Sequence, residues 1–81
     1  MRCTVLLFAQ MAETIRADRL EIELDEGATV RDALDGLAQK HEAIATMADC
    51  LAVAVNERYC PADTTLNNGD TIALIPPVSG G

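Results

Sequence analysis

The sequence ends in Ile-Pro-Pro-Val-Ser-Gly-Gly, and the group in this segment that could do chemistry is the terminal carboxylate of Gly81. Pro76 and Pro77 fix the backbone φ angle in advance and limit the conformations of the residues around them. Gly80 and Gly81 have no Cβ, so their backbone can enter a narrow cleft and approach another molecule closely. Residues 77–81 span roughly 16 Å when extended. Two prolines with a restricted backbone, followed at the end by two glycines without side chains, predict a tail that presents its carboxylate to another protein.

Three cysteines and one histidine are the other candidates for chemistry. Cys3, Cys50 and Cys60 form no Cys-x-x-Cys pair and no metal-ligand spacing, which favours reduced thiols in a cytoplasm and predicts no metal site. A persulfide relay through Cys60 is conceivable, but unreactive thiols buried in strands are commoner. His41 has no cysteine, serine or acidic partner placed by the sequence, so we expect it at a helix end and not in catalysis.

Size and charge limit the class of protein. With 81 residues, 49% of them hydrophobic, the chain is long enough for one globular domain. Its net charge of −7 argues against nucleic-acid and anionic membrane partners, and favours a basic protein partner or serves solubility alone. The apolar run at the N-terminus is too short to span a membrane and has no signal cleavage site. We therefore expect a soluble cytoplasmic protein.

The first half of the chain predicts two strands and one long helix. Residues 3–9 are apolar on both alternating faces, as in an interior strand, and residues 10–17 can form one or two helical turns. Residues 20–24 alternate strictly between apolar and acidic side chains, which is typical of a strand near a sheet edge. Thr29 is a good helix N-cap with Asp32 three positions later. The helix that follows carries an apolar stripe at helical spacing: Val30, Leu34, Leu37, His41 and Ile44.

The second half predicts three strands. Residues 51–60 read as a strand, a turn around 56–58 and a short return strand that Pro61 ends. Residues 67–70 form a turn, and residues 71–75 form the last strand, which the two prolines end. The order β-β-α-β-β-β predicts an α+β fold of the β-grasp type, with a four- to five-stranded mixed sheet packed on one main helix. We expect a domain over residues 1–76 and a flexible tail over 77–81.

The sheet face away from the helix should be apolar. Alternation places Leu6 and Phe8 opposite Val5 and Leu7 on the first strand, and Ile75 faces the same way on the last. An exposed apolar face indicates a protein-binding surface, although loop segments could cover it and Phe8 could belong to the core. The candidates for contact with a partner are Phe8, Tyr59 and Ile75, with Leu6 as a weaker one.

Four segments carry a family resemblance: LFAQMAE, TVRDALDGL, AVNERY and LNNGDTIALIPPVSGG. Together they resemble the small subunits of molybdopterin synthase, which are ubiquitin-like sulfur carriers with a β-grasp fold. The likeness covers nearly the whole chain, and its last sixteen residues are the most specific part.

The resemblance implies a chemistry at Gly81. An ATP-dependent, ubiquitin-activating-like adenylyltransferase would adenylate Gly81, and sulfur from a sulfurtransferase would replace the AMP to give a thiocarboxylate. The large subunit of molybdopterin synthase would then receive this sulfur for cyclic pyranopterin monophosphate, forming the molybdopterin dithiolene in a heterotetramer. The residues that would thread into these enzymes are Pro76, Pro77, Val78, Ser79 and Gly80. The chain would hold no stable cofactor and would catalyse nothing alone.

Two other functions share parts of this pattern. A sulfur carrier for thiamine-thiazole synthesis or another sulfur pathway has the same fold and the same terminal glycines, although the Pro-Pro-Val-Ser context favours the molybdenum cofactor route. A non-covalent ubiquitin-like docking module is the alternative in which the tail is never activated.

Overall fold

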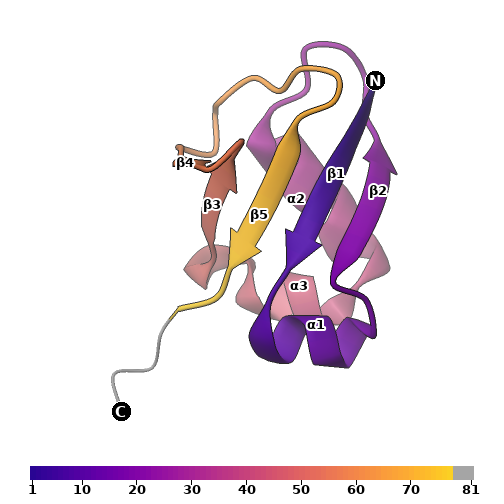
Figure 1. Ribbon diagram of the computed structural model, residues 1–81, viewed down its shortest axis with the longest axis vertical. Helices are drawn as coiled ribbons and strands as arrows, with labels where there is room; N and C mark the ends of the chain where they lie inside the picture. The colour runs from indigo at the N-terminus through magenta and orange to yellow at the C-terminus, as the bar shows by residue number, and fades with distance from the viewer. Residues whose placement is uncertain (78–81) are drawn as a thin grey trace.

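The computed structural model describes residues 1–77 and shows a mixed five-stranded sheet with helices on one side (Figure 1). Its elements are β1 (Arg2–Leu7), α1 (Ala9–Ile15), β2 (Arg19–Glu23), α2 (Val30–Lys40), α3 (Glu42–Met47), the 3-10 turn η1 (Ala48–Cys50), β3 (Ala52–Val55), β4 (Arg58–Tyr59) and β5 (Thr71–Ile75). The predicted α+β class, the strand order along the chain and the helix between β2 and β3 are confirmed.

The strands lie in the spatial order β2-β1-β5-β3-β4. β1 and β5 are parallel, whereas β2 pairs with β1, and β3 with both β5 and β4, in antiparallel fashion. The last strand of the chain therefore lies at the centre of the sheet. The acidic alternating strand β2 lies at an edge, as its sequence predicted.

Alternation along the strands separates the two faces of the sheet. Val5 pairs with Ile72 and Val53 pairs with Leu74, so buried side chains from three strands adjoin on one face. α2 lies across that face (Figure 1) and adds its own buried residues. The core contains Cys3, Val5, Leu7, Met11, Val30, Ala33, Leu37, Ile44, Val53, Leu66, Ile72 and Leu74.

The long helix begins at the predicted cap. The Thr29 side chain accepts a hydrogen bond from the Asp32 backbone N–H, and the Asp32 carboxylate accepts one from the Thr29 N–H at 2.9 Å. This reciprocal capping box satisfies two backbone donors that the first turn of a helix leaves free.

The boundaries predicted for the long helix and for the first strand were wrong, whereas the helical turns predicted over residues 10–17 form α1. The stripe from Val30 to Ile44 belongs to two helices, because His41 is extended at φ −131° and ψ 106° and separates α2 from α3. The first strand ends at Leu7, and Phe8 begins α1 as its N-cap. The helices α1 and α3 both pack below the sheet (Figure 1), so the single main helix has two short companions.

The segment between β4 and β5 packs on the helix side of the sheet. The backbone N–H groups of Val30 and Arg31 donate to the carbonyls of Thr64 and Ala62 at 3.0 and 2.9 Å. Leu66 from this segment is 2% exposed and joins the core. This loop therefore completes the core, and it does not cover the outer face of the sheet.

Replacing Thr29 by alanine should lower the free energy of unfolding by about 1 kcal/mol, because the substitution removes one half of the capping box. For a domain of this size the melting temperature should fall by roughly 4–8 °C. Thr14→Ala, in the exposed part of α1, is the matched control and should leave the melting temperature unchanged or slightly higher. Equal melting temperatures for the two variants would contradict a stabilising cap.

Candidate functional site

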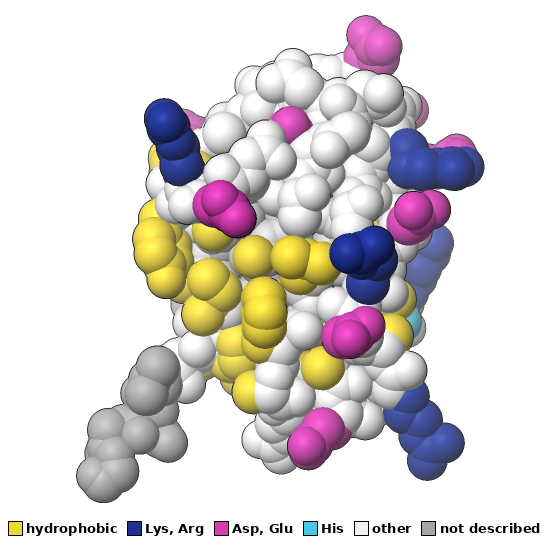
Figure 2. Space-filling view, in the orientation of Figure 1, with side chains coloured by type: hydrophobic (Ala, Val, Ile, Leu, Met, Phe, Trp, Pro, Cys, Tyr) yellow, Lys and Arg dark blue, Asp and Glu magenta, His cyan; other side chains and the backbone are white. Residues whose placement is uncertain are grey.

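The outer face of the sheet carries an open hollow of about 750 Å³. Figure 2 shows this face, with hydrophobic side chains gathered over the β5 and β3 side of the sheet. The residues that line the hollow come from four strands and the turns next to them: Leu6, Phe8, Ala54, Asn56, Glu57, Tyr59, Thr71, Ala73 and Ile75.

All three residues predicted to contact a partner line this hollow. Phe8 is 45% exposed and Tyr59 is 73% exposed, and they are the only aromatic residues of the chain. Ile75 is half-buried at the end of β5, and Leu6 lies between Phe8 and the polar part of β1. Both aromatic side chains of this chain therefore lie at the surface, in the same hollow, and contribute little to the core. The prediction that Phe8 is exposed is confirmed, and its role in binding stays a prediction.

Charged residues bound the apolar surface on the β2 side. The Arg2 guanidinium donates to the Glu23 carboxylate at 2.9 Å and lies 4.0 Å from Glu21. The hydrogen bond from Arg2 and its charge lower the pKa of Glu23 below its usual value. The apolar surface therefore extends from Leu6 and Phe8 at the end of β1 across β5, β3 and β4, and charged residues bound it on the β2 side.

The predicted tail begins beside the hollow. Pro76 and Pro77 follow Ile75 directly, with Pro76 half-buried and Pro77 exposed. The roles predicted for Val78, Ser79, Gly80 and Gly81 concern residues outside the part of the chain that the structure describes. The structure thus places the start of the carboxyl-terminal segment at the margin of the candidate docking surface.

The other candidate residues show no catalytic arrangement. Cys3 is buried in β1, where burial and the nearby Asp70 carboxylate raise the pKa of its thiol, as expected for an unreactive cysteine. Cys60 is partly buried just after β4, and Cys50 is exposed in η1, so the expectation of burial in a strand is met by Cys3 alone. His41 joins α2 to α3, at a helix end as predicted.

Within residues 1–77, no group of three or more histidine, cysteine, aspartate or glutamate side chains could hold a metal ion. No helix in that part of the chain is both long and apolar enough to cross a membrane.

Sequence reasoning did not assign Asn56 and Glu57 to the hollow, although the residue type of Asn56 gave a hint. Asn56 and Glu57 form the two-residue turn between β3 and β4, with positive φ angles of 51° and 71°. The Asn56 side chain donates to Asp70 at 2.9 Å and accepts from the Thr71 backbone N–H at 3.0 Å. Because asparagine tolerates a positive φ angle, Asn56 indicated the turn from the sequence alone. Only the order of the strands in the sheet places this turn beside the start of β5.

Comparison with known proteins decides the family. Residues 5–81 match the ThiS family over almost the whole chain. The chain belongs to the ThiS family. It is 42% identical over 79 residues to the molybdopterin synthase sulfur carrier subunit of Haemophilus influenzae, covering 95% of this chain and 96% of that protein. The corresponding subunit of Mycobacterium tuberculosis is 33% identical over 82 residues, covering 100% and 99%. The resemblance to molybdopterin synthase small subunits is thereby confirmed.

Solved structures of similar proteins confirm the β-grasp fold. Small archaeal modifier protein 1 from Haloferax volcanii superposes with a TM-score of 0.90 at 32% identity, over 100% of both chains. A complex of subunits 1 and 2 of the molybdopterin-converting factor from Helicobacter pylori contains a chain that matches with a TM-score of 0.72 at 26% identity, again over 100% of both chains. An archaeal ubiquitin from Caldiarchaeum subterraneum has the same ubiquitin-like fold.

Replacing Phe8 by alanine should cost much less stability than truncating a core residue of this ThiS-family chain. Phe8 is exposed over nearly half of its surface, so the loss should stay well below the about 3–5 kcal/mol that a core aromatic costs. Leu74→Ala, at a fully buried position, should cost about 2–5 kcal/mol. Urea unfolding of both variants measures the difference, and equal losses would assign Phe8 to the core.

Proposed function

We propose that this chain is the sulfur-carrier small subunit of molybdopterin synthase, and that its terminal Gly81 carries the sulfur as a thiocarboxylate. The observation that carries the proposal is the membership of the full chain in the ThiS family, together with curated relatives of this name at 33–42% identity. The apolar hollow beside the start of the tail supports it, because a carrier must dock while its terminus reaches another active site.

The chemistry of the terminus explains the need for partners. A C-terminal carboxylate has a pKa of about 3.5 and is ionised at neutral pH, where its resonance makes it a poor electrophile. Adenylation by an ATP-dependent activating enzyme releases pyrophosphate and gives the carbonyl carbon a leaving group. A sulfur nucleophile, supplied by a sulfurtransferase, then displaces AMP. The chain itself supplies a carboxylate and a docking surface, and it needs no bound cofactor.

The large synthase subunit is the partner that the hollow fits best. One structural neighbour is described as a complex of subunits 1 and 2 of a molybdopterin-converting factor. In the proposed heterotetramer the large subunit covers Phe8, Tyr59 and Ile75 while the tail enters its active site, where sulfur passes to cyclic pyranopterin monophosphate to form the dithiolene. These steps would take place in the cytoplasm.

Two alternatives remain distinguishable by experiment. A carrier for thiazole synthesis or another sulfur pathway would form the same thiocarboxylate and pass it to a different acceptor. A docking module would bind a partner through the hollow and would show no change at Gly81. A modifier protein of Haloferax volcanii is also 35% identical to this chain, so the acceptor must be tested directly.

Incubation with ATP, the activating enzyme and sodium sulfide should increase the intact mass by the difference between one sulfur and one oxygen atom. Fragmentation should map the change to Gly81. The Gly81→Val variant should stay unmodified with an unchanged melting temperature, because its side chain would block access to the adenylation site. An unmodified wild-type chain in the presence of active enzyme would refute the carrier chemistry.

Removing the aromatic side chains of the hollow should weaken binding to the large subunit. We expect Phe8→Ala and Tyr59→Ala each to raise the Kd by about tenfold, as for exposed aromatic anchors at protein interfaces. Gln39→Ala, at an exposed position of α2, should leave the Kd unchanged. Isothermal titration calorimetry checks this, and unaltered affinity in both aromatic variants would place the interface elsewhere.

A further inference from the structure

The hollow has one charged residue, Glu57, among its lining side chains. Glu57 is the second residue of the β3–β4 turn, and Tyr59 follows two positions later on β4. Both residues are exposed and both line the hollow. One end of this apolar surface therefore combines a carboxylate with the face or edge of an exposed aromatic ring.

Glu57 occupies a backbone conformation that glutamate disfavours. Its φ angle of 71° lies in the left-handed region, and a two-residue hairpin turn of this kind favours glycine at the second position. A side chain here costs conformational free energy that glycine would avoid. Strained positions are enriched at functional sites, so the carboxylate at this position is a candidate for binding.

The turn that carries Glu57 is held firmly. Asn56 is hydrogen-bonded through its side chain to Asp70 and to the Thr71 backbone, and its backbone N–H donates to the Thr71 carbonyl at 2.8 Å. The Asp70 carboxylate also accepts from the Asn67 backbone N–H at 2.8 Å. This network fixes the turn against the start of β5, so the carboxylate is presented from a rigid support.

No cation among residues 1–77 neutralises Glu57. The ion pairs of this part of the chain all involve Arg2, which lies at the β2 margin of the outer face. Arg58 is adjacent in sequence, but it alternates with Tyr59 on β4 and does not line the hollow. The carboxylate is thus available to a cation from outside.

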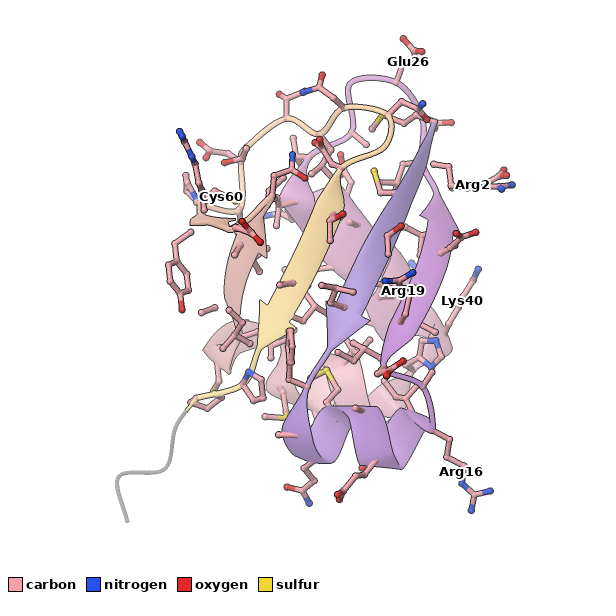
Figure 3. All side chains as sticks on the ribbon, viewed as in Figure 1. Arg2, Arg16, Arg19, Glu26, Lys40 and Cys60 are labelled. Carbon is pink, nitrogen blue, oxygen red and sulfur yellow. The ribbon has the colours of Figure 1, made fainter. Side chains whose placement is uncertain are left out.

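The opposite margin of the outer face, along β2, carries charges of both signs, from Arg2, Arg19, Glu21 and Glu23. Arg19 lies next to Leu6 in the β1–β2 register. Figure 3 shows Arg19 in front of the sheet, whereas Arg16 and Lys40 point away from it. The charges at the β2 margin balance one another, whereas the Glu57 carboxylate attracts a basic group of a partner at the β4 margin, which favours one orientation of the partner.

We propose that the hollow binds an arginine side chain of the large subunit, with its guanidinium paired to Glu57 and stacked on Tyr59. This inference rests on the proposed function, because it specifies the chemistry of the surface that docks there. A guanidinium is planar, pairs with a carboxylate and stacks on an aromatic ring, and its aliphatic stem suits the apolar floor formed by Ala54 and Ala73.

The test compares Glu57→Gln with Glu26→Gln in the full chain, using the large synthase subunit as the probe. Glu26 is an exposed residue at the end of the molecule opposite the carboxyl end of β5 (Figure 3), so it controls for the loss of one negative charge. At an ionic strength of about 0.05 M we expect Glu57→Gln to raise the Kd about fivefold, and Glu26→Gln to raise it less than about twofold. At about 0.5 M salt the difference should shrink below about twofold. Equal Kd values for the two variants at low salt would overturn the proposal, as would a loss that salt does not reduce.

A double-mutant cycle with Tyr59→Leu tests the shared arginine. Leucine keeps an apolar side chain at position 59 but removes the aromatic ring, so we expect a loss of about threefold. If one guanidinium contacts both residues, the loss in Glu57→Gln/Tyr59→Leu should be smaller than the product of the single losses. Losses that multiply would overturn the shared contact.

These outcomes separate the two proposals. If the wild-type chain binds the large subunit and Phe8→Ala weakens binding, but Glu57→Gln behaves like Glu26→Gln, the arginine site is refuted and the docking surface stands. If the wild-type chain gains no sulfur at Gly81 and does not bind the large subunit, the proposed function itself fails.

Discussion

β5 pairs with β1 in parallel on one side and with β3 in antiparallel fashion on the other, and this pairing places the last strand of the chain at the centre of the sheet. Ile72 and Leu74 are buried against α2, so the strand is fixed by the core as well as by its two neighbours. Because a strand alternates its side chains, the same fixation directs Ala73 and Ile75 to the outer face. The positions of the hollow and of the start of the tail therefore both depend on β5.

Through β5, the outer face of the sheet is joined directly to the carboxyl-terminal segment that begins at Pro76. The outer face is charged along β2, where Arg2 pairs with Glu21 and Glu23, and mostly apolar from the end of β1 across β5, β3 and β4. Ile75 lines the hollow, and Pro76 follows it. A partner that covers the hollow thus holds the origin of the tail at a defined place, which reduces the entropy lost when the terminus enters an active site.

The β3–β4 turn shows how a local cost is compensated by neighbouring contacts. Asn56 and Glu57 both adopt positive φ angles, and the hydrogen bonds of Asn56 to Asp70 and Thr71 stabilise the turn. These contacts join two turns far apart in the sequence, at one edge of the hollow. The result is a firmly held turn that carries Glu57 at the margin of a mostly apolar hollow, which Tyr59 also lines.

The sequence by itself determined the order of the strands, the capping box of α2 and the family, because alternation, cap residues and motifs are local patterns that survive without tertiary contacts. It favoured an exposed Phe8 but left a core position open. It could not determine the break at His41, since the apolar stripe continues across it and only packing of α3 decides where the helix ends. It also could not bring Asn56 and Glu57 to the hollow. The tertiary structure decided that, because the position of a turn relative to a distant strand depends on which strands pair.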